Sequence, residues 1–68
     1  MVNANKIKGR MRELCLTQRD IAIRMGVSQA AINQKINNTR SLSLEEAEKL
    51  SDILNVSDKD FRAYFFAH

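Results

Sequence analysis

Apolar residues recur every three or four positions in five stretches of this chain, which is the spacing of one face of an α-helix. The predicted helices run from Ala4 to Leu14, from Gln18 to Met25, from Gln29 to about Asn37, from Leu44 to Leu54, and onward from near Asp58. Their predicted core-facing residues are Ile7, Met11, Leu14, Ile21, Ala22, Met25, Ile32, Ile36, Ala47, Leu50, Ile53, Leu54 and Phe61. The pattern therefore predicts an all-α fold, a compact five-helix bundle.

Polar residues mark the expected helix starts. Thr17-x-x-Asp20, Ser43-x-x-Glu46 and Ser57-x-x-Asp60 resemble capping boxes, in which a hydroxyl accepts from the backbone N–H three residues on. The acid of each box favours the positive end of its helix. Ser28 is a fourth candidate N-cap. Since each of these signals precedes apolar residues at helical spacing, together they support the predicted boundaries.

The composition bounds the architecture and the compartment. Residues 1–68 make a single domain, with no Pro, two Gly and scattered β-branched residues, all of which favours helices. The single cysteine, Cys15, has no partner for an internal disulfide and no companions for a metal site, so we expect a reduced thiol in a cytoplasmic protein. No apolar run approaches the ~20 residues of a membrane span, and no signal-peptide core follows Met1.

Charge is distributed unevenly along the chain, whose formal net charge is +3. Residues 1–40 hold eight Lys and Arg against two Asp and Glu, whereas residues 41–68 hold three against six. A basic first half points to a polyanionic partner. Ordinary solvated surface charge stays an alternative at this point, since charge alone does not identify a nucleic-acid binder.

The most informative segment joins two short predicted helices through Gly26-Val27-Ser28. Gly26 stands where the first of them must end with a positive φ, which glycine adopts without steric cost. Ala22, one turn earlier, is small enough to let the second helix approach, while Val27 fills the corner and Ile32 anchors the second helix. These features specify a helix-turn-helix at about residues 17–37.

The same segment resembles a known family. Leu16-Thr17-Gln18-x-x-Ile21-Ala22-x-x-Met25-Gly26-Val27-Ser28-Gln29-x-x-Ile32 is similar to the lambda/434 repressor and Cro class of helix-turn-helix domains, the XRE-type family. Asn37-Asn38 stands at that family's usual Asn-Gly, and Leu50-x-x-Ile53-Leu54-x-Val56-Ser57-x-x-x-Phe61 fits its last two helices. The resemblance covers residues 5–63 and extends to short phage and prophage regulators. It implies a repressor in the bacterial cytoplasm, at the nucleoid, that binds a pseudo-palindromic operator in double-stranded DNA with its third helix in the major groove.

The outward face of the third predicted helix carries the candidate base contacts. With Ile32 and Ile36 inward, a 100° step per residue turns uncharged small or amide side chains outward. Gln and Asn can bond bidentately to adenine, and Ala can contact a thymine methyl group. The resemblance adds Gln29, the first residue of this helix, as the strongest candidate for a base contact. The alternative is that a Gln at this position contacts only phosphate. The predicted base contacts are Gln29, Ala30, Asn33 and Gln34.

Phosphate contacts are predicted around that face. The resemblance assigns Gln18 to a phosphate and to bracing Gln29, and it assigns Asn37 to a phosphate. Charge and placement add basic side chains, for which ordinary surface charge is the alternative. The full predicted set is Gln18, Ser28, Lys35, Asn37, Arg40, Arg10 and Lys6.

Three departures from the resembled family are expected to matter locally. Cys15 stands in a turn where the family usually has Gly, and a non-Gly residue in the left-handed region costs on the order of 1 kcal/mol. Met11 and Ile36 occupy the positions of a charged pair, and we interpret them as an apolar replacement, which is often no less stable. Asn38 replaces the usual Gly, but Asn tolerates that backbone conformation better than most residues.

The sequence holds no recognisable catalytic set. The one histidine is His68, and we find no nucleophile–base pair, no cluster of metal ligands and no phosphate-binding Gly loop. We therefore expect no enzymatic activity, no metal, no cofactor and no small-molecule ligand.

Specific reading of DNA also requires more than one recognition helix, because a single one spans too few base pairs to specify a site in a genome. We expect a homodimer, formed mainly on DNA if free pairing is weak, through the segment that ends at Ala67. Its predicted contacts are Tyr64, Phe65 and Phe66. Consecutive helical residues point about 100° apart, so at least one of the three should be exposed. The alternative is that Phe65 closes the core and Phe66 frays.

Two other functions stay open. The bundle could be a protein-interaction module, such as an antitoxin or a partner of another repressor, that grips its target with the aromatic last helix. A nonspecific nucleoid protein is disfavoured by the modest net charge. The outward amides of the third helix favour the DNA-binding regulator over the protein-interaction module.

Overall fold

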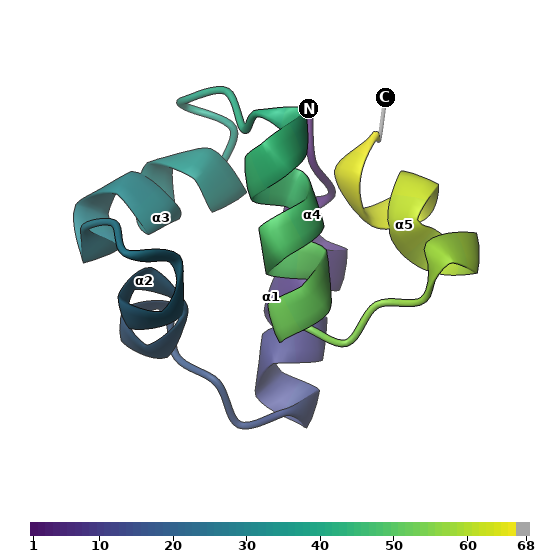
Figure 1. Ribbon diagram of the computed structural model, residues 1–68, viewed down its shortest axis with the longest axis horizontal. Coiled ribbons are helices and arrows are strands. Elements are labelled where there is room, and N and C mark those ends of the chain that lie inside the picture. The colour runs from purple at the N-terminus through teal and green to yellow at the C-terminus, as the bar shows by residue number, and fades with distance from the viewer. Residues whose placement is uncertain (67–68) are drawn as a thin grey trace.

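Five helices make up the computed structural model, which describes residues 1–66 (Figure 1). They are α1 (Ala4–Glu13), α2 (Gln18–Met25), α3 (Gln29–Ile36), α4 (Leu44–Ile53) and α5 (Asp58–Phe65). No strand occurs within the described residues, so the predicted all-α class is confirmed, and each predicted boundary lies within about one residue of the observed one. Ala67 of the predicted pairing segment and His68 lie outside the described residues.

The helix starts use the predicted side chains, with one exception. Thr17 with Asp20, and Ser43 with Glu46, form complete capping boxes. Ser28 caps α3 by accepting from the N–H of Ala31 at 3.1 Å. The predicted box at Ser57-x-x-Asp60 is wrong, because the Ser57 hydroxyl donates to the Asp60 carboxylate at 3.2 Å and does not cap the backbone.

The cap of α1 comes from a residue that the sequence patterns did not single out. The side chain of Asn3 accepts from the N–H of Lys6 at 3.0 Å. Asn is among the best N-cap residues, but Asn3 is not followed by an acid at the third helical position, so no box marked it.

Several turns depend on left-handed backbone. Gly26 ends α2 with φ +70°, as its position predicted. Cys15, Asn38 and Asn55 adopt φ values of +56°, +64° and +56°. Cys15 therefore adopts a left-handed conformation although it is not Gly, at the steric cost that a Cβ imposes there. The left-handed turn at Asn55, between α4 and α5, was not predicted.

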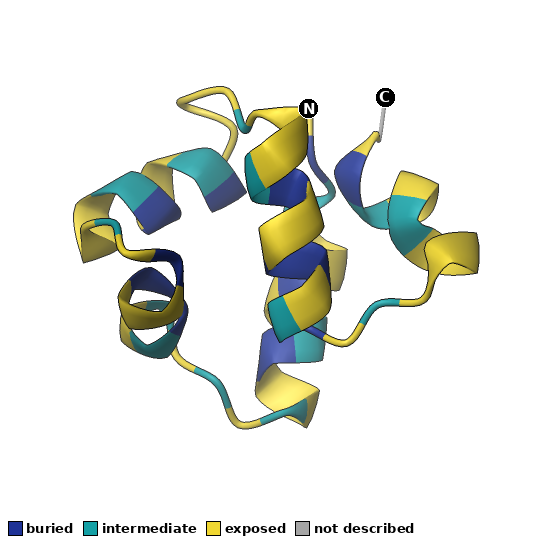
Figure 2. Ribbon diagram, viewed as in Figure 1, coloured by how far each residue is buried: buried dark blue, intermediate teal, exposed yellow. Residues whose placement is uncertain are grey.

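The core lies between the inward sides of all five helices, as the buried segments in Figure 2 show. Met11 and Ile36 are both buried in this core, and their interpretation as an apolar replacement for a charged pair stays a prediction. Leu14, Ile53 and Phe61, predicted to face the core, are half-buried and pack against its edge. The buried apolar residues are Val2, Ile7, Met11, Ile21, Ala22, Met25, Ile32, Ile36, Ala47, Leu50, Leu54 and Phe65.

The arrangement separates two sides of the molecule. In Figure 1, α2 and α3 lie on one side of α4, and α5 lies on the other, against α1. Hydrogen bonds tie α5 and the preceding loop to the start of the chain: the N–H of Asn3 donates to the carbonyl of Tyr64 at 2.7 Å, and the Arg10 Nε donates to the carbonyl of Leu54 at 2.8 Å. None of the helices within residues 1–66 is long and apolar enough to cross a membrane.

Candidate nucleic-acid interface

The pair α2–α3 is held together by apolar contacts and by a short connection. Ile21, Ala22 and Met25 are buried on α2, and Ile32 and Ile36 are buried on α3. The connection of residues 26–28 turns sharply because Gly26 is left-handed and the N–H of the next residue bonds back to the α2 carbonyl of residue 22 at 3.0 Å. The side of α3 opposite its buried residues is therefore fixed relative to α2.

That opposite side of α3 is exposed and uncharged. The periodicity correctly predicted that Ala30, Asn33 and Gln34 face outward there. Their contact with bases is a prediction that rests on the resemblance and on the chemistry of amides. The exposed residues of this face are Gln29, Ala30, Asn33, Gln34 and Asn37, the last being the C-cap of the helix.

A chain of polar contacts crosses the exposed face. The Asn33 Nδ2 donates to the Gln18 Oε1 at 3.2 Å, which links α3 to the first residue of α2. The Asn37 Nδ2 donates to the carbonyl oxygen of Asn33 at 2.9 Å, and the Asn37 Oδ1 accepts from the Lys8 Nζ at 2.8 Å. The resemblance predicted that Gln18 would brace Gln29. In the structure the Gln18 Oε1 accepts from Asn33, one turn further along α3.

The basic residues predicted to touch phosphate are in different situations. Arg40 is exposed in the connection between α3 and α4. The Lys35 ammonium, in contrast, is paired with the carboxylate of Glu46, and the Lys35 side chain is largely covered. Lys35 is therefore not a free cation in this fold, because α4 supplies an acid directly opposite it, and its contact with a phosphate stays a prediction.

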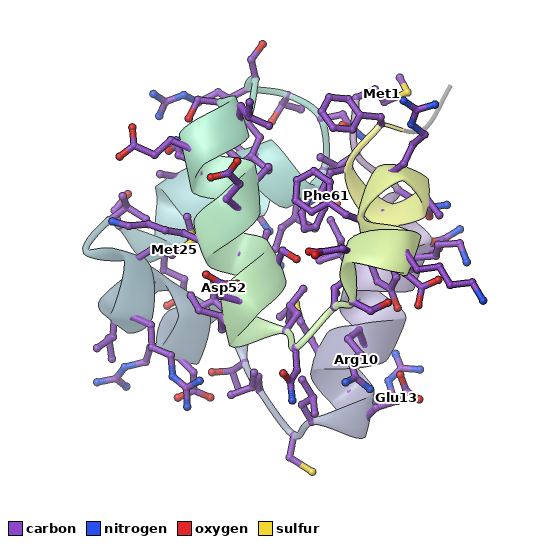
Figure 3. All side chains as sticks on the ribbon, turned by 45° about the vertical axis from the view of Figure 1, so that its right-hand side comes forward. Met1, Arg10, Glu13, Met25, Asp52 and Phe61 are labelled. Carbon is purple, nitrogen blue, oxygen red and sulfur yellow. The ribbon has the colours of Figure 1, made fainter. Side chains whose placement is uncertain are left out.

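Two further predicted phosphate contacts belong to the other side of the molecule. Arg10 is held by the carbonyls of Leu54 and Asn55, at 2.8 Å and 3.4 Å, and it lies beside Glu13 on α1 (Figure 3). Its role in the structure is to fix the α4–α5 connection. The Lys6 Nζ lies 5.7 Å from the centre of the Tyr64 ring, a cation–π contact with α5. Neither side chain is directed by these contacts toward α3.

Lys8 is a candidate that the sequence did not supply. Its charge was evident, but periodicity within one helix does not tell which neighbouring helix an exposed side chain reaches. The structure brings its ammonium to Asn37, at the C-terminal end of α3. Lys8 and Arg40 are thus the bases that flank that end of the exposed face.

The predicted aromatic pairing segment is split by the fold. Phe65 is only 3% exposed and is part of the core, so it is not available to a dimer surface in this fold. Its ring lies 4.9 Å from that of Phe61, centroid to centroid. Tyr64 is half-buried, whereas Phe66 is 51% exposed, which confirms that at least one of the three aromatics reaches the surface.

Phe66 is not isolated. It borders a groove of about 410 Å³ together with two other exposed apolar residues, Met1 at 77% and Leu44 at 59% exposure. Met1 projects beside the end of α5 in Figure 3. Arg40 and Leu42 also line this groove. An apolar surface of this kind, with three large exposed side chains in one place, is typical of a contact site for another protein.

The class defined by these observations is a small all-helical domain with an amide-bearing exposed helix. Residues 2–68 match the model of a family described as a protein of unknown function, DUF739, and the chain belongs to that family. A comparison with curated proteins finds no match. The family description gives no activity.

Proposed function

We propose that the protein is a sequence-specific DNA-binding regulator of transcription, a repressor that inserts α3 of a helix-turn-helix into the major groove. The observation that carries the proposal is the exposed face of α3, where amides and a methyl group stand outward with no charged side chain among them. A solvated helix face is more often rich in Glu and Lys, as α4 is with Glu45, Glu48 and Lys49.

The chemistry of this face fits base edges in the major groove. The groove is wide enough to admit an α-helix, and an amide can offer a donor and an acceptor together, as adenine requires. The methyl of Ala30 is of the kind that contacts thymine. The neighbouring side chains of Gln18, Lys8 and Arg40 are suited to phosphate oxygens, which position a protein on DNA without reading its sequence.

The electrostatics of α2 and α3 support the same proposal. The one acid within these two helices is Asp20, and its carboxylate is already engaged by the N–H and hydroxyl of Thr17 at 2.9 Å each. The surface presented to a phosphate backbone therefore holds few repulsive groups.

We further propose that two copies bind a pseudo-palindromic operator, in the manner of the resembled family. The groove bordered by Met1, Leu44 and Phe66 is the surface we assign to pairing, in place of the full aromatic segment. Such a small apolar contact fits a dimer that forms mainly on DNA, since stable interfaces bury on the order of 800 Å² per partner.

The same groove favours one alternative function, a protein-interaction module that holds a different protein, for example as an antitoxin or a partner of another repressor. The two functions differ in what α3 does. In the interaction module, substitutions on the exposed face of α3 would leave the activity unchanged.

The experiment that tests the proposal is selection of bound sites from random double-stranded DNA, followed by affinity measurement on the selected site. Gln29→Ala is expected to weaken binding to the selected site by about 1–3 kcal/mol and to leave binding to random DNA nearly unchanged. Asn5→Ala, an exposed amide on α1, is the matched control and is expected to bind like the wild type. Failure to enrich any sequence would overturn the proposal.

A further inference from the structure

We infer that Asn33 reads an adenine in the operator and that Gln18 is the positioning residue that orients its amide for this purpose. The inference rests on the proposed function and adds to it the residue, the base and the orienting contact. It starts from the hydrogen bond between the Asn33 Nδ2 and the Gln18 Oε1, two side chains that lie fifteen residues apart in the sequence.

The backbone that carries the Gln18 side chain is fixed by the cap of α2. Gln18 is the first residue of α2, directly after Thr17, whose capping box with Asp20 sets the backbone of that first turn. The Gln18 side chain is half-buried, so it is less free to rotate than a side chain in open solvent. In this contact the Gln18 Oε1, which can only accept, faces the nitrogen end of the Asn33 amide.

The Asn33 side is held as well. The main-chain carbonyl oxygen of Asn33 accepts a hydrogen bond from the Asn37 side chain, and the Asn37 side chain accepts one from Lys8 on α1. The turn of α3 that carries Asn33 is therefore linked to α2 through its side chain and to α1 through its main chain. Among the four predicted base contacts, Asn33 is the one whose side chain has a partner within residues 1–66.

The orientation decides what Asn33 can recognise. An Asn amide has two N–H groups and one carbonyl oxygen. One N–H is engaged by Gln18, so the second N–H and the side-chain carbonyl oxygen stay available on an exposed side chain. For the reading of adenine, the N–H bonded to Gln18 is the one that points away from this oxygen, which leaves the other N–H beside it. This edge offers one donor and one acceptor. In the major groove, adenine presents the complementary acceptor N7 and donor N6, whereas guanine presents two acceptors.

Preorganisation distinguishes Asn33 from the other amides of α3. Gln29 and Gln34 are longer and exposed, so each must give up rotamer freedom when it binds a base. Asn33 has fewer rotatable bonds and an orientation already set by Gln18. The base pair opposite Asn33 is therefore expected to show a sharper preference than one contacted by a free Gln.

The test uses the site selected for the wild type and measures affinity for every single-base replacement in it. We expect one adenine position where replacement weakens wild-type binding roughly 5- to 150-fold, and where Asn33→Ala removes this preference. Replacing that adenine by 7-deazaadenine, which lacks the N7 acceptor, should weaken wild-type binding and leave Asn33→Ala unaffected.

The role of Gln18 is tested by two substitutions at its position. Gln18→Ala is expected to reduce the preference at the same adenine and to add nothing when combined with Asn33→Ala. Gln18→Glu keeps an acceptor oxygen for Asn33 and brings a negative charge to the phosphates, so it should keep the adenine preference while overall affinity falls. A merely structural role of Gln18 would lower affinity for all bases alike and would overturn the positioning role.

The outcomes separate the inference from the proposed function. If no site is selected by the wild type, the proposed function fails. If a site is selected and Gln29→Ala weakens it, but Asn33→Ala preserves every base preference, the inference alone is wrong. Circular dichroism of each variant confirms that the helices are intact, and Asn5→Ala again serves as the control for loss of an exposed amide.

Discussion

The side chain of Asn38 holds the main chain of Val2 through two hydrogen bonds. The N–H of Val2 donates to the Asn38 Oδ1 at 2.8 Å, and the Asn38 Nδ2 donates to the carbonyl oxygen of Val2 at 3.0 Å. Val2 itself is buried in the core, and Asn38 is the left-handed residue just after α3. The contact therefore fixes the end of the candidate DNA-reading helix to the segment that precedes α1.

Substitutions at Asn38 are expected to separate the contribution of its hydrogen bonds to stability from the cost of its left-handed backbone. Asn38→Ala removes both hydrogen bonds and puts a less tolerant residue at a positive φ, so it should lower the free energy of unfolding by about 2–4 kcal/mol. Asn38→Gly also removes both bonds but relieves the backbone strain, so its loss should be smaller, about 1–2 kcal/mol. Urea unfolding followed by circular dichroism measures both values. Equal stability of the alanine and glycine variants would show that the backbone conformation contributes nothing.

The fold could be predicted from sequence because its determinants are local. Thr17, Ser28 and Ser43 cap the helices that their spacing predicted, and Gly26 takes the conformation that its position required. The contacts of Asn38 with Val2 could not be predicted, because the sequence pattern around neither residue indicates that the two segments meet. The Asn38 position drew attention as a turn, but its side-chain partner depends on how five helices pack.

Arg40 and Lys35 are expected to differ in their effect on DNA binding. Arg40→Gln should reduce the slope of log affinity against log salt by about one unit, because one phosphate contact is lost. Lys35→Gln should leave the slope unchanged and lower the free energy of unfolding by about 1 kcal/mol, because Glu46 loses its partner. Salt titrations of binding and urea unfolding give the two quantities.

Lys59→Gln is the control for this comparison, since Lys59 is an exposed base on α5. It should change neither the salt slope nor the stability. A slope that falls by one unit in Lys35→Gln would mean that Lys35 leaves Glu46 for a phosphate when DNA binds.

Acid should destabilise the protein partly through its two capping boxes. Hydrogen bonds from Thr17, first from its N–H, lower the pKa of Asp20, and the hydrogen bond from Lys35 lowers the pKa of Glu46, with the N–H of Ser43 adding to it. Because both folded-state pKa values lie below the unfolded ones, this stabilisation is complete above about pH 5 and is lost as the pH falls below about 4.

Thermal unfolding between pH 7 and pH 2.5 measures this dependence. Asp20→Asn and Glu46→Gln should each be less stable than the wild type at pH 7 and should lose less stability on acidification. Glu48→Gln, an exposed acid on α4, is expected to follow the wild-type curve. Wild-type-like curves for the Asp20 and Glu46 variants would show that the boxes contribute no pH dependence.

Phe66 and Phe65 are neighbours with opposite expected roles. Phe66→Ser should keep a stable helical monomer and weaken both self-association and cooperative operator binding, because Phe66 is exposed beside the apolar groove. Phe65→Ser should cost about 3–5 kcal/mol of stability, because Phe65 is a core residue. Sedimentation and mobility-shift assays test the first expectation, and urea unfolding tests the second. Unchanged association and affinity in Phe66→Ser would assign pairing to another surface.

The candidate site was predictable only in part. The features that depend on one helix could be predicted, and the contacts that depend on packing between elements could not. Helical periodicity identifies which residues of α3 point outward, because that depends on one helix alone. It did not identify the partners of Gln18, Lys35 and Arg10, because each is chosen by a neighbouring helix or loop. Charge counted along the sequence therefore did not show that Lys35 and Arg10 already have partners within the fold.

The hydrogen bond between Asn3 and Tyr64 has a consequence for the order of folding. It closes a loop of almost the whole chain. Such closure is slow because the chain loses conformational entropy before the stabilising contacts form. The contacts between α2 and α3, in contrast, join residues a few turns apart. We therefore expect the α2–α3 unit to be structured in the folding transition state and the docking of α5 to follow. Kinetic φ-values near zero for Phe65 and well above zero for Ala22 would bear this out, and the reverse order would refute it. The exposed face of α3 would then form before the groove bordered by Met1, Leu44 and Phe66, which is complete only when α5 has docked.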